Sequence, residues 1–285
     1  MTSRAAADFA RSCVPSITSS GRRASLLTED GVRIEAEYAP AADTSHAAPD
    51  GLVVVLAHGF TGSLDRPALR RAAAAFAQYS PVITFSFRGH GRSGGRSTVG
   101  DREVLDLAAA VRWARTLGHT RVATVGFSMG GSVVVRHAAQ YPAAHKGRTG
   151  AHTDMVVAVS APARWYYRGT AAMRRLHWVV ERPLGRLVGR LGLRTRIHGI
   201  AWDPVPLSPT EAAPLIAPTP LLIVHGDRDA YFPLDHPRAL AAAAAPASTD
   251  LWIEPGYGHA ENAAAPELLE RIAGWIRQRA SAAPQ

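Results

Sequence analysis

Ser128 occupies the centre of the pentapeptide Gly126-Phe127-Ser128-Met129-Gly130. An apolar run, residues 122–125, precedes this pentapeptide, and a helix-like stretch, residues 131–137, follows it. A serine on a sharp strand-to-helix turn is held with its hydroxyl exposed, and small neighbours are needed because the backbone passes close by. The pentapeptide alone is weak evidence in a chain with 25 glycines. Its position between strand and helix makes Ser128 a candidate nucleophile.

A serine hydroxyl attacks a carbonyl carbon only when a neutral histidine takes its proton, and a carboxylate must orient that histidine. Two carboxylates, Asp227 and Asp229, follow the apolar run 221–224. We favour Asp229 because it ends a Gly-x-x-Asp turn, whereas Asp227 is expected to hydrogen-bond the turn itself; spacing alone does not separate the two. His259, which follows the last apolar run, is the histidine candidate, and His236 is its serious rival. The resulting chain order of serine, aspartate and histidine is the one expected for such a turn.

Attack on a carbonyl forms an oxyanion, which needs backbone N–H donors already in place. Met129, directly after the serine and at the start of a helix, is expected to offer one donor. The loop 58–62 follows another apolar run, and we assign the second donor to Phe60 in this loop. His58 is expected to brace the loop rather than to transfer protons. Four other histidines are expected at the surface: His119, His137, His145 and His152.

The elements that must position these residues alternate between two patterns. Helical periodicity occurs at residues 104–111 and 268–275. Continuous apolar strands separated by such helices indicate an α/β protein with a mostly parallel sheet covered on both sides. Residues 23–28 and 32–38 flank a turn and predict an opening antiparallel hairpin. Six apolar runs too short for helices predict the buried strands, at residues 52–57, 82–87, 122–125, 155–159, 221–224 and 251–253.

Residues 163–214 interrupt this alternation. Their apolar residues predict two short amphipathic helices, over 173–180 and 184–191. A helical insertion at the carboxyl edge of a sheet is well placed to roof a pocket, although a packing appendage is the alternative. The segment holds nine arginines against three acidic residues, so six of the nine net positive charges lie in it. An anionic ligand or a solvated surface would each explain this excess, and no nucleic-acid motif accompanies it.

Length and composition set the domain organisation that we expect. A chain of 285 residues with 47% hydrophobic residues can form one large α/β domain. We predict a disordered tail over 1–22, a core made of 23–162 and 215–279, and a helical cap over 163–214. The single cysteine excludes an internal disulfide. No apolar run is long enough to cross a bilayer and residues 1–22 do not resemble a secretory signal, so we expect a soluble cytoplasmic protein.

In combination, these motifs resemble the α/β-hydrolase superfamily, in particular its cap-bearing esterases and monoacylglycerol-lipase-like members. The resemblance covers roughly residues 23–279 except the cap, and it implies Ser128 as nucleophile, Asp229 as acid and His259 as base. It also implies the amides of Phe60 and Met129 as oxyanion donors, with no metal and no organic cofactor. Ser86 departs from the pattern, because many relatives have an aspartate there. The motifs that carry the resemblance are His58-Gly59-Phe60, Arg88-Gly89-His90-Gly91-Arg92-Ser93, Gly126 to Gly130, Gly226 to Asp229 with Pro233, and Gly258-His259.

We therefore hypothesise a serine hydrolase that cleaves small-molecule carboxylic esters through an acyl-serine intermediate. The apolar faces of the cap suggest a short to medium acyl chain, and its arginines leave an anionic or membrane-proximal substrate open. The same residues could serve thioester or amide cleavage, acyl transfer or peracid formation, and a non-catalytic ligand-binding protein could keep the same pocket. The sequence leaves the oligomeric state open.

Two other kinds of site fit the sequence less well. Residues 89–94 match G-x-G-x-x-G, but a dinucleotide site would open a helix within the glycines and place an acidic residue about twenty positions on, at the end of the next strand. Here that stretch lies inside a helix expected to end near residue 117. His225, Asp227 and Asp229 lack a recognised zinc spacing.

Overall fold

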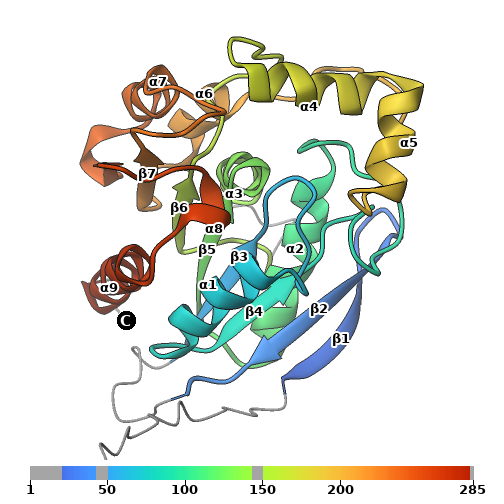
Figure 1. Cartoon of the computed structure of the whole chain (residues 1–285). Helices are drawn as coiled ribbons and strands as arrows, with labels where there is room; N and C mark the ends of the chain where they lie inside the picture. Colours follow the sequence, from blue (N-terminus) through green and yellow to red (C-terminus); the bar gives the residue numbers. More distant parts are fainter. Residues whose placement is uncertain (1–20, 43–50, 143–149, 283–285) are drawn as a thin grey trace, which may run out of the picture.

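A single eight-stranded sheet forms the centre of the computed structural model, which describes residues 21–42, 51–142 and 150–282 (Figure 1). The strand order is β1-β2-β4-β3-β5-β6-β7-β8. Pairing is antiparallel for β1–β2 and β2–β4 and parallel for all the others, so the predicted mostly parallel sheet is confirmed. The strands are β1 (Arg22–Leu27), β2 (Arg33–Ala39), β3 (Leu52–Ala57), β4 (Val82–Phe85), β5 (Arg121–Phe127), β6 (Met155–Val159), β7 (Leu221–Gly226) and β8 (Thr249–Glu254).

The predicted strands agree closely with these bounds, and the opening hairpin is formed by β1 and β2. β5 and β7 each extend two residues beyond the predicted end, whereas β4 is shorter than predicted and ends at Phe85 rather than at residue 87. Beyond it, the amide of Ser86 still bonds the carbonyl of Glu35. The amide of Phe87 instead donates to the ring of His58, at 3.0 Å, so the backbone has already left the sheet.

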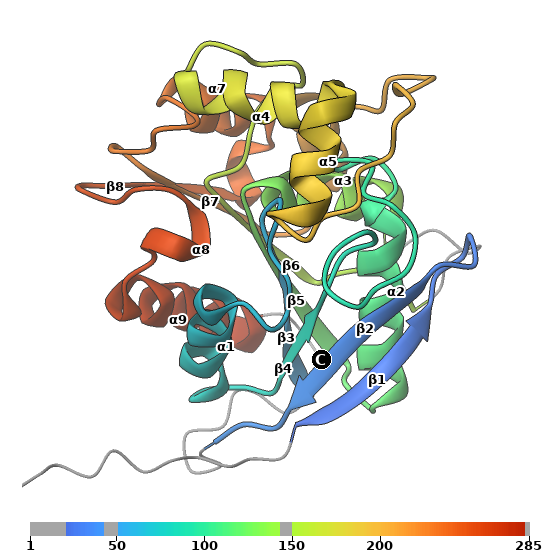
Figure 2. The same ribbon diagram turned by 45° about the vertical axis from the view of Figure 1, so that its right-hand side comes forward.

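Helices cover both faces of the sheet. Side chains of successive strand residues point to opposite faces, so Val53 and Val55 pack with α2, α3 and α7, whereas Val54 and Leu56 pack with α1 and α9. Figure 2 shows α1 and α9 on one side of the sheet and α2 and α3 on the other. Both predicted amphipathic faces, at 104–111 and 268–275, are buried here. The helices are α1 (Pro67–Ala77), α2 (Glu103–Thr116), α3 (Met129–Gln140), α4 (Ala171–Glu181), α5 (Pro183–Leu191), α6 (Pro209–Ala212), α7 (Asp235–Ala243), α8 (Ala260–Ala263) and α9 (Pro266–Ala282).

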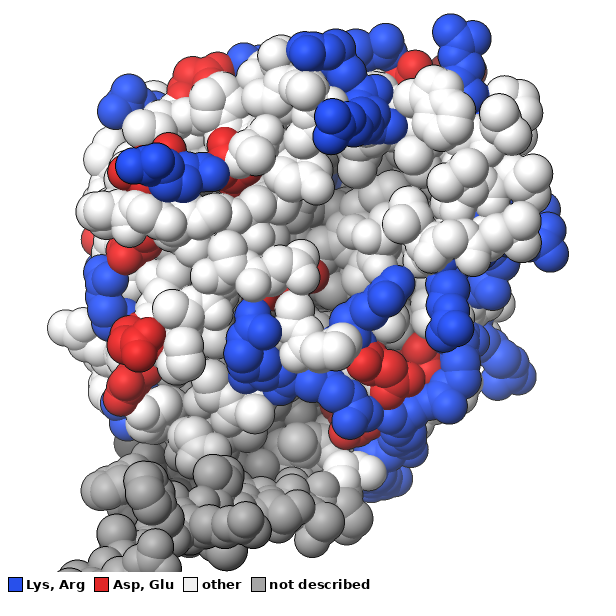
Figure 3. All heavy atoms as spheres, viewed as in Figure 1, with Lys and Arg blue, Asp and Glu red and all other residues white. Residues whose placement is uncertain are grey.

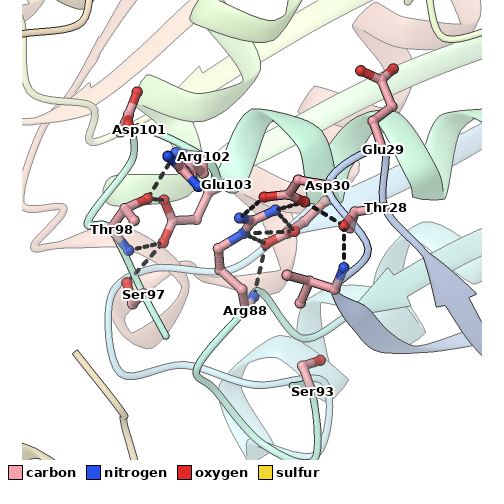
Figure 4. A network of polar contacts seen from close by, with 12 residues as sticks. Thr28, Glu29, Asp30, Arg88, Ser93, Ser97, Thr98, Asp101, Arg102 and Glu103 are labelled. Carbon is pink, nitrogen blue, oxygen red and sulfur yellow. Dashed lines mark hydrogen bonds and ion pairs between the residues drawn. The ribbon is translucent and has the colours of Figure 1, made fainter. Parts of the chain in front are cut away.

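Arg88, in the loop after β4, joins the opening hairpin to α2 (Figure 4). Its guanidinium contacts Asp30 at 2.6 Å on one side and Asp106 at 2.8 Å on the other. The Arg88 and Asp106 side chains are 3% and 0% exposed. Removing two charges from water is costly, and here the cost is offset by further hydrogen bonds, including the Arg88 amide to Asp106 at 2.8 Å.

Glu103, at the start of α2, fixes the loop that leads into that helix (Figure 4). This buried carboxylate accepts hydrogen bonds from the amides of Thr98 and Gly100, at 2.8 and 2.9 Å, and from the Ser97 hydroxyl at 2.8 Å. The carbonyl of Thr98 in turn accepts a hydrogen bond from the Trp202 indole at 2.7 Å. Glu103 therefore holds a loop on which residues 163–214, here called the insertion, are seated.

Both helices predicted for the insertion are present, as α4 and α5, and Figure 1 shows them over one end of the sheet. An amphipathic helix packed on the core would bury its apolar face, but most apolar residues of these two helices are not buried. In α4 only Met173 is buried, and in α5 only Gly185 and Gly189 are. Four apolar side chains of α5 instead face solvent: Leu184, Leu187, Val188 and Leu191. In the part of the chain that is described, no helix is both long enough and apolar enough to cross a bilayer.

Candidate active site

Ser128 lies at a sharp turn between β5 and α3. Its φ of +52° and ψ of −113° form a conformation that a non-glycine residue adopts only at a cost. The turn is packed too tightly for side chains on either flank, because a Cβ on Gly126 would lie 2.1 Å from the Gly130 carbonyl oxygen. A Cβ on Gly130 would lie 2.2 Å from the carbonyl oxygen of Ala57. The predicted need for glycine at both positions is therefore confirmed.

The three side chains singled out in the sequence form one continuous hydrogen-bonded series. His259 Nε2 lies 2.9 Å from Ser128 Oγ, and His259 Nδ1 lies 2.7 Å from Asp229 Oδ2. A carboxylate only accepts hydrogen bonds, so Nδ1 of the neutral ring carries the hydrogen and Nε2 accepts from the serine hydroxyl. This is the arrangement in which a histidine can take the proton of a serine.

The side chain of Asp229 is fully buried in the loop that follows β7. Its other oxygen, Oδ1, accepts hydrogen bonds from the amides of Tyr231 and Phe232, at 2.8 and 3.0 Å. Burial alone would raise the pKa of Asp229, but the hydrogen bond from His259 and the two amides outweigh it and lower the pKa. The carboxylate is therefore ionised beside the imidazole.

Asp227, the alternative carboxylate, points elsewhere. It is exposed, and its Oδ1 accepts a hydrogen bond from the amide of Gly256 at 2.7 Å. This amide belongs to the loop after β8, so the prediction that Asp227 bonds its own turn is wrong in that detail. The structure places Asp229, and not Asp227, against His259.

Aromatic rings and a second histidine surround the imidazole. The Tyr231 ring stacks on His259 with centroids 4.2 Å apart and planes at 28°. His225 Nε2 lies 2.8 Å from the Phe232 carbonyl oxygen and 3.5 Å from Asp229 Oδ2. Burial lowers the pKa of His225, so its ring is neutral and adds no charge next to the aspartate. No sequence signal singled out Tyr231. It lies beside His259 because its amide bonds Asp229 in the turn that carries both residues.

The loop after β3 carries Phe60, and its amide has no hydrogen-bond acceptor among the described residues. Met129 is the first residue of α3, so its amide has no partner within the helix. His58 Nε2 accepts from the Phe87 amide at 3.0 Å, which leaves Nδ1–H to donate to the carbonyl of Gly59 at 2.7 Å. His58 thus braces the loop, as predicted. Two unpaired amides remain that could receive an oxyanion.

Ser86, the position that departs from the expected pattern, is paired with a carboxylate from another strand. Its hydroxyl donates to Glu35 Oε1 at 2.7 Å and accepts from the Leu64 amide at 3.0 Å. Glu35 lies on β2 and also accepts from the amide of Arg92 at 2.9 Å. A carboxylate is therefore present next to the Arg-Gly-His-Gly turn, supplied from a distant part of the chain.

Glu261 is a buried acidic residue that sequence reasoning missed. It lies on α8, two residues after His259, and is 6% exposed. Its Oε1 accepts a hydrogen bond from the amide of Gly59 at 3.0 Å, and Oε2 has no partner among the described residues. A Cβ placed on Gly59 would lie 3.3 Å from Oε2 and 3.4 Å from Ser128 Cβ. Burial raises the pKa of Glu261. The available signal was a single acidic residue in the alanine-rich stretch 260–265.

Among the described histidines, only His259 is hydrogen-bonded to Ser128 Oγ. His236, the rival base, is buried on α7, and its Nδ1 accepts from the amide of Ala163 at 2.9 Å. His137 was expected at the surface, but it is 0% exposed and stacks on Tyr141, because α3 is enclosed on nearly all sides. His119 and His152 are partly buried, and His145 lies outside the described residues. Across the described segments, no group of three metal-ligating side chains could hold a metal ion.

Comparisons with known proteins agree with this architecture. Residues 53–165 match the family model described as alpha/beta hydrolase fold. A monoacylglycerol lipase of Mycolicibacterium smegmatis is 28% identical over 265 residues, which cover 79% of this chain and 87% of the relative. The Pyrococcus furiosus esterase Pf2001 superposes with a TM-score of 0.67 at 21% identity, over 92% of this chain and 90% of that one.

A second solved structure, Est1E from Butyrivibrio proteoclasticus with ferulic acid bound, has a TM-score of 0.59 at 20% identity. That alignment covers 91% of this chain and all of the other. The sheet order and these matches confirm the predicted α/β-hydrolase fold, and they support the predicted resemblance to esterases and lipases of that fold.

Proposed function

We propose that this protein is a serine hydrolase that cleaves carboxylic esters through an acyl-serine intermediate. The observation that carries the proposal is the series Ser128, His259 and Asp229, with atoms 2.9 and 2.7 Å apart, at a sharp, partly buried turn with two unpaired amides. The lipase and esterase names of similar proteins support an ester as the substrate, rather than a thioester or an amide.

In the proposed reaction His259 Nε2 takes the hydroxyl proton while Ser128 Oγ attacks the ester carbonyl carbon. The negative charge that forms on the carbonyl oxygen is accepted by the amides of Phe60 and Met129. The imidazolium then gives its proton to the leaving alkoxide, and an alcohol departs. A water molecule, deprotonated by the same nitrogen, attacks the acyl-serine and releases the acid. Asp229 stays ionised throughout and stabilises the imidazolium.

We further propose that the insertion acts as a cap over this site. The Thr170 hydroxyl, at the start of α4, donates to the Tyr231 carbonyl at 2.9 Å, so the cap is attached to the loop that carries Asp229. A Cβ on Gly100 would lie 3.5 Å from the Trp165 ring and 3.9 Å from Met129 Cγ, so Trp165, near the start of the cap, lies close to the serine turn. The space-filling view shows a hollow below α4 and beside α5 (Figure 3).

The test is hydrolysis of p-nitrophenyl esters of increasing acyl length by the wild type and four variants. Ser128→Ala and His259→Ala should each lower kcat by about 10⁴-fold or more. Asp229→Asn should lower it by roughly 10⁴-fold, because the imidazole then adopts the wrong tautomer. Asp227→Asn is the matched control, and it should keep kcat within about twofold because Asp227 is exposed.

Loss of activity in Asp227→Asn alone would reassign the acid, and full activity in His259→Ala would remove the proposed base. A burst of p-nitrophenol that is stoichiometric with enzyme is expected where deacylation is slow. Tight stoichiometric binding without turnover of any acyl substrate would instead indicate a ligand-binding protein on this fold.

A further inference from the structure

A cavity of about 300 Å³ lies between α5 and the loop that follows β4. Arg186 and Arg190 on α5, Arg96 on the loop and Arg196 after α5 line it, and no acidic residue does. Its apolar part is formed by Pro183, Leu187 and Ile197. We call it the arginine pocket. Figure 3 shows basic side chains gathered below α5, at the edge of the hollow under the insertion.

The backbone around the arginine pocket is fixed by hydrogen bonds between the insertion and the core. The amide of Ser97 donates to the Arg196 carbonyl at 2.7 Å, and the amide of Arg196 donates to the Gly89 carbonyl at 2.8 Å. Two guanidinium groups are also held in place by carbonyl oxygens. Arg186 donates to the Glu181 carbonyl at 2.8 Å, and Arg196 donates to the carbonyl of Ser93. The pocket is therefore built before any ligand arrives.

None of these four arginines forms an ion pair with a carboxylate in the described parts of the chain. Elsewhere many exposed arginines do, as in Arg92 with Glu35 and Arg168 with Glu181. Four like charges around one cavity repel each other, and a bound anion would remove this repulsion. A planar guanidinium group can donate two hydrogen bonds to two oxygens of one phosphate. A phosphate also carries more negative charge than a carboxylate, so it neutralises more of the four positive charges.

The size and lining of the pocket further limit the class of ligand that fits it. A volume of about 300 Å³ lies at the lower end of the range for small-molecule sites. The apolar contribution of Leu187 and Ile197 fits an organic group attached to the anion better than an inorganic ion. We propose that the arginine pocket binds a phosphate monoester, either a soluble one or one carried on a lipid headgroup. This binding does not depend on the proposed hydrolase activity.

The test is isothermal titration calorimetry of the full chain at low salt, with glycerol 3-phosphate and inorganic phosphate as probes. The variant is Arg96→Gln combined with Arg190→Gln, since both side chains are exposed and make no hydrogen bond among the described residues. The matched control is Arg238→Gln, an exposed arginine on α7 without an ion pair in the described chain. We expect one binding site, weakened about tenfold or more in the double variant and unchanged in the control.

A second arm identifies the source of the phosphate. Sedimentation with phosphatidylcholine vesicles, prepared with and without phosphatidic acid, measures binding to a lipid headgroup. Retention that needs phosphatidic acid and is lost in the double variant assigns the pocket to a lipid phosphate. Calorimetric binding without vesicle retention assigns it to a soluble phosphate monoester. The proposal is overturned if no probe binds the wild type, if the double variant binds as the wild type does, or if Arg238→Gln weakens binding equally.

Discussion

Glu261 offers the sharpest test of how the proposed oxyanion loop is held. Its Oε1 accepts the hydrogen bond of the Gly59 amide at 3.0 Å, and Gly59 directly precedes Phe60. The orientation of the Gly59 peptide influences the direction of the Phe60 amide, because only two soft dihedral angles separate them. We therefore expect Glu261 to act as a positioning residue, through the loop and without touching the substrate.

The expected magnitude follows from what each substitution removes. In Glu261→Ala the buried Gly59 amide has no acceptor, and an unsatisfied buried donor costs about 1–3 kcal/mol. The loop can avoid this cost by moving so that the amide reaches water. A loop that moves takes the Phe60 amide with it, and one oxyanion donor is worth about 10²- to 10³-fold in kcat. Glu261→Gln keeps an oxygen acceptor and the same shape. Because burial raises the pKa of Glu261, a neutral side chain is a close substitute there.

The assay is kcat and KM on one p-nitrophenyl ester, together with thermal unfolding to establish that each variant is folded. We expect kcat of Glu261→Ala to fall about 100-fold with little change in KM, and Glu261→Gln to stay within about threefold of the wild type. The matched control is Glu267→Ala, an exposed glutamate in the first turn of α9. The reasoning is refuted if folded Glu261→Ala keeps the wild-type kcat, or if the glutamine variant loses as much as the alanine variant.

Three further predictions concern stability, measured by urea unfolding. Burial lowers the pKa of His137 to about 3, so on acidification the unfolded chain binds a proton at this histidine near pH 6.5 and the folded chain does not. The free energy of unfolding should therefore fall by about 2 kcal/mol between pH 8 and pH 5 because of this group. His137→Phe should remove this part of the pH dependence of stability. Gly274→Ala, inside α9 with no atom within 4 Å of the new Cβ, should add about 0.5–1 kcal/mol, and a loss would show that the helix is constrained there. Asp106→Ala leaves the buried Arg88 charge with Asp30 as its only ion-pair partner among the described residues and removes the acceptor of the Arg88 amide, so it should cost about 3 kcal/mol. Arg92→Ala removes an exposed partner of Glu35 and should cost less than about 1 kcal/mol; equal costs would contradict the argument from burial.

The central strands were predicted well because they are buried on both faces. The runs 52–57 and 155–159 coincide with β3 and β6, and every residue of these strands is buried. The end of β4 could not be predicted, since it depends on His58 taking the Phe87 amide away from the sheet. Local apolar content predicts that a segment is buried, but it does not predict which distant group accepts the hydrogen bond of a given amide.

The candidate site divides in the same way. Ser128 was recognisable because its local conformation demands glycines at fixed spacing, and His259 because it follows the last strand. Glu261 was missed because its partner, Gly59, is 202 residues away along the chain. His137 was misplaced because a helix enclosed on nearly all sides shows no polar face from which its orientation could be read. Residues defined by local geometry were found, and residues defined by distant contacts were not.

The order of strands explains how Ser128, Asp229 and His259 meet. Ser128 follows β5, whereas Asp229 and His259 follow β7 and β8, and β6 lies between the two groups in the sheet. Although β6 contributes none of the three side chains, its end holds both sides of the site. The carbonyl of Val159 accepts from the Ser128 amide at 2.8 Å, and the hydroxyl of Ser160 accepts from the Ala260 amide at 3.0 Å.

The serine turn and the histidine loop are thus both anchored to two consecutive residues of one strand end. Because a parallel sheet fixes the distance between strand ends, the Ser128 to His259 contact is set by the sheet rather than by either loop. Ser160 has a φ of +51°, a conformation that costs energy for a non-glycine residue. The backbone strain at Ser128 and at Ser160 therefore lies on adjacent strand ends, on either side of the point where the hydroxyl meets the imidazole.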